Sequence, residues 1–187
     1  MRLGEAEVRL LVQVVDELDL LLSGGADADQ PATSDQPAPA ASTDPLAEMA
    51  GLDWPDSTAV ETPTDPALRR LLPDAYRDDD AAAAEFRRYT DATLRGEKRA
   101  DATVVRQGLA SIAVTGKRVL DDRQTQAWLR CLTDARLVLA SRLDIEKADD
   151  HQRLARLDAD DPRTMIYTVY SWLGGLLEDL LAAIGAT

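Results

Sequence analysis

Apolar residues recur every three or four positions along most of this chain, which is the pattern of helices that bury one face. The widest apolar stretch is Trp128–Leu143, where apolar side chains cover more than one helical face. One stripe holds Trp128, Leu132, Ala135 and Leu139, and Leu129, Cys131 and Val138 widen it. A helix that is apolar over so much of its circumference normally packs on several sides. We therefore predict an all-α domain with this helix at its centre and Asp121 as its N-cap.

The other elements predicted from this pattern make a single helical-bundle domain of about five or six helices. The first is Glu5–Ser23, which Gly24–Gly25 ends, and the second is Asp65–Leu72, which Asp65 caps. Asp78–Arg99 forms one helix or two, and its predicted inner stripe is Ala82, Phe86, Tyr89 and Thr93. The remaining elements are a helical stretch through Val105, Leu109 and Ile112, a turn of helix around Gln152–Leu157, and a last helix from Pro162. In the last helix, Gly174–Gly175 predicts either a bend or close approach to another helix.

Residues 24–44 are predicted to form a disordered acidic linker inside this domain, which otherwise spans residues 1–187. Residues 26–44 contain only Ala, Asp, Gln, Pro, Thr and Ser, so they cannot offset the entropy cost of ordering. Residues 24–65 carry nine acidic and no basic side chains, whereas residues 66–187 carry 20 acidic and 19 basic ones. The net charge of −13 therefore comes mainly from one segment, and nucleic-acid binding is disfavoured.

Large apolar side chains reappear just after this linker. They are Leu46, Met49, Leu52 and Trp54. A Trp in an otherwise polar segment usually docks on a protein surface, because an exposed indole forgoes its burial energy. We expect these residues to complete the core, with a partner-facing docking motif as the alternative.

Several features indicate a soluble cytoplasmic protein. A single cysteine excludes an intramolecular disulfide in this chain, which fits a reducing compartment. The charged start MRLGEAEVRL does not have the apolar run of a signal peptide. No stretch approaches the roughly 18 apolar residues that cross a bilayer. We expect no membrane association.

Three sequence blocks carry a family resemblance. LLPDAY at 71–76, EFRRYT at 85–90 and AWLRCLTDARLVLASRLDI at 127–145 resemble the actinobacterial domain-of-unknown-function family numbered 2017. The chain departs from the family pattern at Leu72, Thr133 and Ala140. The resemblance implies the predicted helical fold and a genomic context beside a Clp protease adaptor. It implies no assigned activity.

Asp134, Arg136 and Arg142 are the charged residues of the central helix that we predict to form a structural polar network. Arg130 and Asp134, and likewise Arg142 and Glu146, stand four residues apart and can pair along the helix. Arg136 can instead meet an acid or carbonyl groups of another helix. The alternative is a polar pocket that binds an anionic ligand, although no glycine-rich phosphate loop lies nearby.

Cys131 lies on the apolar face of the same helix, so burial as a small hydrophobic residue is the main expectation. The alternative is a redox-sensitive thiol, which requires thiolate character and access. We predict no catalytic residue, cofactor or metal site, because a single histidine cannot supply the usual set of zinc ligands.

Arg95, Lys98 and Arg99 belong to a stretch in which basic residues outnumber acidic ones. A solvated helix face explains such a stretch most simply, and a partner-facing basic face is the second interpretation. A glycine-containing turn at Thr115–Lys117 between two helices also loosely resembles a helix-turn-helix, which keeps DNA binding open.

The function predicted from these features is that of a non-catalytic cytoplasmic regulatory or adaptor protein that binds another protein. We expect a partner from the transcription or proteolysis machinery, and a homodimer through the last helix. The first alternative is a thiol-sensitive transcriptional regulator that acts on DNA or on transcription proteins. The second is a ligand-binding protein or enzyme with a pocket near Asp134 and Arg136.

Overall fold

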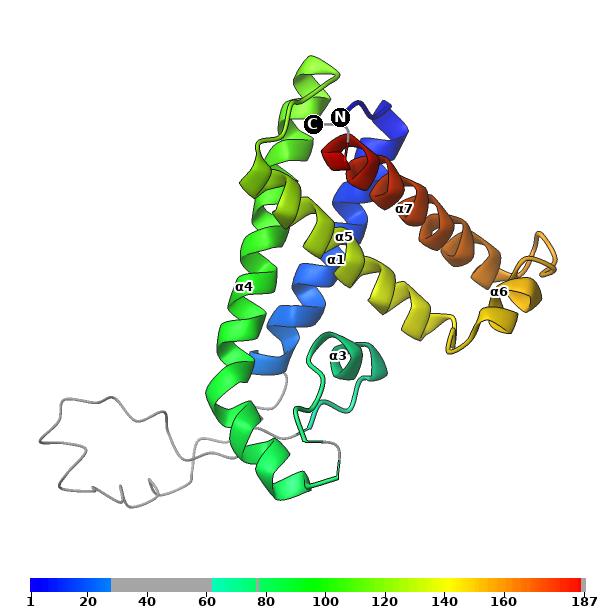
Figure 1. Ribbon diagram of the computed structural model, residues 1–187. Coiled ribbons are helices and arrows are strands. Elements are labelled where there is room, and N and C mark those ends of the chain that lie inside the picture. The colour runs from blue at the N-terminus through cyan, green and yellow to red at the C-terminus, as the bar shows by residue number, and fades with distance from the viewer. Residues whose placement is uncertain (28–61, 77, 186–187) are drawn as a thin grey trace, which may run out of the picture.

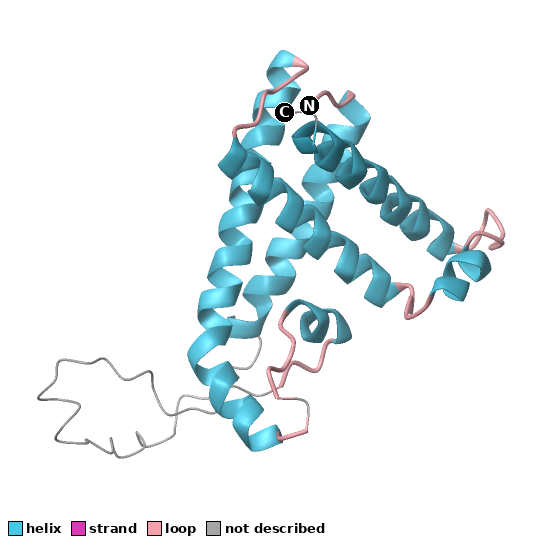
Figure 2. Cartoon of the chain, in the orientation of Figure 1, coloured by secondary structure: helices cyan, strands magenta, loops and turns pink. Residues whose placement is uncertain are grey.

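Helix α5 (Asp122–Arg142) lies at the centre of the computed structural model, where α1, α3, α4 and α7 all contact it (Figure 1). The structure describes residues 1–27, 62–76 and 78–185. Within these residues every regular element is a helix (Figure 2), which confirms the prediction of an all-α fold. The other helices are α1 (Glu5–Asp27), α3 (Pro66–Leu71), α4 (Asp80–Thr115), α6 (Ala148–Leu154) and α7 (Pro162–Gly185).

The main core forms where α1, α4 and α7 pack on α5. Trp128 and Leu132 of α5 are fully buried there, which confirms the predicted inner stripe of the central helix. Helix α1 contributes Leu11, Val15, Leu18 and Leu22 to the same core. Each large apolar side chain buried in this way contributes about 1.5–3 kcal/mol relative to exposure.

Helix α1 is longer than predicted, because it continues through Gly24 and Gly25 to Asp27. Glycine accepts the left-handed geometry that often ends a helix, but it does not impose that geometry. Leu22 is buried in the core, and the helix continues past it through both glycines. The predicted linker from 24 therefore begins inside a helix, and its residues from 28 onward lie outside the described part of the chain.

Helix α4 is one continuous helix, and its inner face differs from the predicted one. Phe86 and Tyr89 were predicted to face inward but are 43% and 46% exposed, and Thr93 is also exposed. Charged residues take the inner positions instead, because each of them has a partner. Arg87 pairs with Asp74, which precedes the helix, and Asp91 pairs with Arg95. A rule that places apolar residues inside cannot anticipate this exchange.

Side-chain caps fix where the helices begin. Asp121 and Gln124 form a capping box at the start of α5, as predicted for Asp121. Asp79 caps α4, and Gly116 ends that helix with a φ of 71°. At α3 the Asp65 carboxylate accepts a hydrogen bond of 2.7 Å from the Ala67 amide and also binds Arg142 of α5. Asp65 therefore ties a short helix to the central one.

Replacing Asp65 with alanine is expected to lower the free energy of unfolding by about 1 kcal/mol, the typical loss of an N-cap. The Arg142 guanidinium holds the pKa of Asp65 below its usual value, so its stabilisation is present above the unfolded pKa and is lost as pH falls through the folded pKa. Urea unfolding at neutral and acidic pH measures both effects. Asp65→Asn keeps a capping oxygen and should retain most of the stability at neutral pH. Equal losses in the two variants would contradict a capping role.

A second, smaller apolar cluster forms at the far end of α5, where α6 and α7 meet it. It holds Ala140, Leu143, Ile145 and Leu154, with Tyr167 and Tyr170 packed against it. The side chain of His151 stacks on Tyr170 with ring centroids 5.7 Å apart. Helix α7 then runs through Gly174 and Gly175 without ending, back toward the start of α5.

Candidate functional site

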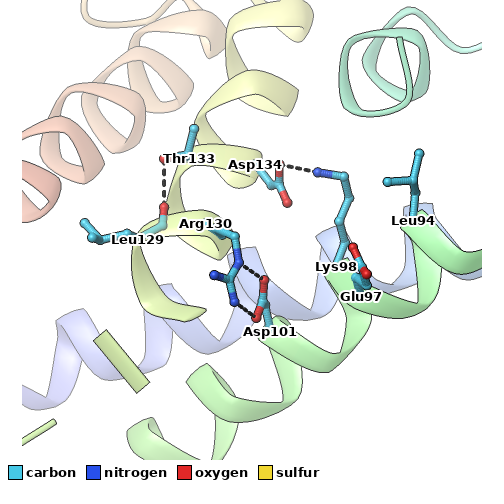
Figure 3. Close-up of a pocket in the computed structure, with 8 residues that line it drawn as sticks. All are labelled: Leu94, Glu97, Lys98, Asp101, Leu129, Arg130, Thr133 and Asp134. Carbon is cyan, nitrogen blue, oxygen red and sulfur yellow. Dashed lines mark hydrogen bonds and ion pairs between the residues drawn. The ribbon is translucent and has the colours of Figure 1, made fainter. Parts of the chain in front are cut away.

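A cleft of about 280 Å³ lies between α4 and α5 (Figure 3), and it contains two of the charged residues singled out in the sequence, Lys98 and Asp134. The residues that line it are Leu94, Glu97, Lys98, Asp101, Leu129, Arg130, Thr133 and Asp134. Both helices present polar groups here, because this face lies at the margin of the apolar core. The cleft is therefore rich in charge.

Two ion pairs cross this cleft and join the helices. Lys98 donates a hydrogen bond of 2.8 Å to Asp134, and Arg130 donates two hydrogen bonds of 2.7 Å to Asp101 (Figure 3). The bidentate geometry between a guanidinium and a carboxylate is the strongest form of this contact. The charges in the cleft thus hold α4 against α5.

Asp134 is the most deeply buried carboxylate in the cleft, with 6% of its surface exposed. Burial raises the pKa of Asp134, and the hydrogen bond from Lys98 lowers it only in part. The ionised carboxylate is therefore less favourable in the folded chain than in the unfolded one. Its charge depends on Lys98 for compensation.

Cys131 lies fully buried on α5, one turn from the cleft residues. Burial raises the pKa of the thiol to about 12, and the nearby carboxylate of Asp134 adds to this increase. A thiol with such a pKa is almost entirely protonated near neutral pH, and the protonated form is a weak nucleophile. In this conformation Cys131 fills space in the core as a small hydrophobic residue, which is the main expectation from the sequence.

Cys131 is accordingly expected to resist alkylation in the folded protein. A rise in pKa from 9.0 to about 12 lowers the thiolate fraction about a thousandfold. Iodoacetamide labelling followed by mass spectrometry should therefore be slow in buffer and fast in urea. Labelling that proceeds equally fast under both conditions would show that the thiol is accessible in the native state.

The other residues of the predicted polar network lie apart from Asp134. The Arg136 guanidinium stacks 4.5 Å from the ring centre of Tyr170 on α7, and Arg142 binds Asp65. A Cβ atom at Gly174 would lie 3.3 Å from Cζ of Arg136, so the glycine permits this close approach, one of the two roles predicted for it. The three residues do not form one network.

The pairings predicted along the central helix are also replaced by contacts between helices. Arg130 was expected to pair with Asp134 but binds Asp101, and Arg142 was expected to pair with Glu146 but binds Asp65. Each observed bond joins α5 to residues from another part of the chain, 29 and 77 positions away. Such partners have no signature in a local sequence window.

The predicted basic face of α4 is also engaged in ion pairs. Arg99 binds Asp19 of α1, Arg95 binds Asp91, and Lys98 binds Asp134 as described above. Arg106 on the same helix reaches both Asp16 and Asp19. These cations therefore already have carboxylate partners within the chain, so this helix face carries little unpaired positive charge.

Comparison with known proteins identifies the family of this chain. The family model described as "Domain of unknown function (DUF2017)" matches residues 1–184. This protein belongs to the DUF2017 family. A relative from Mycobacterium tuberculosis H37Rv, named oxidative stress regulator AosR, is 31% identical over 76% of this chain and 67% of its own length. The putative oxidative stress regulator AosR of Mycobacterium leprae is 29% identical over 78% of this chain and 70% of its own length. No solved structure matches.

The described residues of this DUF2017 chain show neither a metal-binding cluster nor a membrane-spanning helix. Among residues 1–27, 62–76 and 78–185, no group of three or more His, Cys, Asp or Glu side chains is placed to hold a metal ion. Within the same residues, no helix combines the length and hydropathy needed to span a membrane. The predicted docking residues Leu46, Met49, Leu52 and Trp54 lie outside the described part of the chain.

A group of exposed aromatic side chains in this DUF2017 chain was not predicted from the sequence as a surface feature. Tyr76 lies just before α4, and its ring meets Phe86 edge to face, with the centroids 6.2 Å apart. Tyr89, one turn farther along, has the Arg88 guanidinium 4.7 Å from its ring centre. All three rings are substantially exposed, and we call them the aromatic surface. Two blocks of the family resemblance meet here, yet the periodicity of α4 assigned two of these rings to the core.

Proposed function

We propose that this chain is a non-catalytic cytoplasmic regulatory protein that acts by binding another protein during the response to oxidative stress. Relatives named as oxidative stress regulators support the regulatory part of this proposal. The DUF2017 family model matches nearly the whole chain and is not confined to one segment. This match supports proposing for this chain the regulatory role named for its relatives.

One observation carries the choice of a protein partner over nucleic acid or a reacting substrate. Four cations of α4 and α5 that could bind an anionic substrate or a DNA backbone are paired with carboxylates of the same chain: Lys98, Arg99, Arg106 and Arg130. Binding to DNA releases counterions only when basic groups are free to replace them. Cys131 is buried with a raised pKa, so it is poorly suited to act as a nucleophile.

The test is affinity capture of the full chain from native lysate, after nuclease treatment and with and without brief exposure to peroxide. We expect a reproducible protein partner, identified by mass spectrometry, whose yield changes on oxidation. A purified complex of the two proteins then gives the stoichiometry.

The opposing result is equally specific. The purified chain would bind duplex DNA with a submicromolar Kd at physiological salt, while no protein is captured. That result would favour the transcriptional alternative, in which the protein contacts DNA directly. Sedimentation velocity of the purified chain would separately test the predicted homodimer, which should sediment as a dimer.

A further inference from the structure

The aromatic surface is built by the chain that joins α3 to α4. Leu71 and Leu72 are buried, and Asp74 then binds Arg87 on the inner face of α4. This ion pair fixes the connection against the helix and brings Tyr76 beside Phe86. The rings are thus held in place before any partner arrives, which reduces the entropy cost of binding.

These rings are three of the few aromatic side chains of the chain. The sequence has four tyrosines, one phenylalanine and three tryptophans, and three of these eight residues lie on the aromatic surface. Tyr76, Phe86 and Tyr89 are 51%, 43% and 46% exposed, so a partner can still bury much of their surface. Tyrosine and other aromatic residues are enriched among the side chains that dominate protein interfaces.

The charges around this surface are mostly negative. Asp78, Asp80 and Glu85 are exposed carboxylates close to the rings in the sequence, and Asp79 is a fourth that also caps α4. Of the nearby described cations, Arg87 is buried against Asp74, and Arg88 lies over Tyr89. Exposed carboxylates next to exposed rings along the chain favour a partner that brings positive charge.

We propose that the aromatic surface binds a basic segment of a partner protein, in which Lys or Arg side chains alternate with apolar ones. The apolar side chains cover Tyr76 and Phe86, and the cations contact the exposed carboxylates of Asp78, Asp80 and Glu85. This inference rests on the proposed function and adds to it the place of contact and the chemistry of the partner.

The test uses the full chain and two fluorescent synthetic peptides, one an amphipathic helix of leucine and lysine and the other its leucine–glutamate counterpart. Fluorescence anisotropy should show binding of the basic peptide, weakening as salt is added, and binding of the acidic peptide at least about tenfold weaker. Tyr76→Ala with Phe86→Ala should weaken binding of the basic peptide by about tenfold or more.

Two control variants make the test specific. Val114→Ala with Val119→Ala removes apolar surface that is even more exposed but lies elsewhere, and should leave binding unchanged. Asp80→Asn with Glu85→Gln keeps the rings and should weaken binding mainly at low salt. Tm values close to that of the parent protein show that the variants fold.

The outcomes separate this inference from the proposed function. Unchanged affinity for the basic peptide in the ring variant, or equal affinity for both peptides, overturns the inference. Preferential binding of a single-stranded oligonucleotide, stacked on the rings, also overturns it. A partner captured from lysate equally well by the parent and the ring variant would leave the proposed function standing while this surface is excluded.

Discussion

Replacing Gly108 with alanine is expected to lower the free energy of unfolding by about 2 kcal/mol, although alanine is the better helix former. Gly108 lies on α4, where that helix crosses Trp128 of α5. A Cβ atom at this position would lie 2.8 Å from Cζ2 of Trp128 and 3.1 Å from its Nε1. The indole is fully buried and rigid, so it cannot move aside as a flexible side chain would.

Gly96 on the same helix provides the matched control. A Cβ atom there meets nothing within 4 Å, so Gly96→Ala should stabilise the protein by about 1 kcal/mol through helix propensity alone. Urea unfolding of both variants measures the two changes in the free energy of unfolding, which are expected to have opposite signs. Equal stabilisation by the two substitutions would show that α4 and α5 are not packed as closely as described.

A double-mutant cycle identifies Trp128 as the cause. Trp128→Phe removes the ring atoms that the new methyl group would meet, at the cost of a cavity. In that background the penalty for Gly108→Ala should shrink by about 1 kcal/mol or more, because the two positions are in contact. A penalty that stays the same would place the clash elsewhere.

This contact illustrates what the sequence could and could not predict. The apolar stripe through Trp128 identified the central helix, because a helix packed on several sides must be apolar on several faces. Gly108 carried no signal, since its role depends on which point of α4 crosses that stripe. The N-caps Asp65 and Asp121 were predictable, because capping uses a few adjacent residues.

The candidate site was predicted only in part for a similar reason. Asp134 and Lys98 were both selected as charged residues, but their bond joins positions 36 residues apart. The pairings predicted along the central helix were local ones, and Arg130 and Arg142 instead bind carboxylates from distant parts of the chain. Phe86 and Tyr89 were assigned to the core because Arg87 was not expected to face inward, and that orientation depends on its tertiary partner Asp74.

The bond between Lys98 and Asp134 gives the largest expected effect. Lys98→Met should lower the free energy of unfolding by about 3 kcal/mol at neutral pH, because it leaves a buried carboxylate without its partner. Arg130 does not replace the lost cation, since both of its hydrogen bonds go to Asp101. Lys117→Met, at an exposed lysine, is the control and should change stability by less than about 0.5 kcal/mol.

The pH dependence gives this prediction a definite sign. Burial raises the pKa of Asp134 above its unfolded value, so protonation favours the folded state, and stability from this group is lost as pH rises through the folded pKa. Removing Lys98 raises that pKa further. The Lys98→Met deficit should therefore be greatest at neutral pH and shrink as pH falls toward the unfolded pKa.

Adding Asp134→Asn removes the stranded charge, so the double variant should recover much of the stability lost at neutral pH and should have a flatter pH profile. Recovery would show that the cleft is a structural contact between α4 and α5, separate from the aromatic surface. If Lys98→Met instead keeps full stability but loses the captured partner, the cleft itself contacts that partner. A deficit independent of pH would contradict the role assigned to the Asp134 carboxylate.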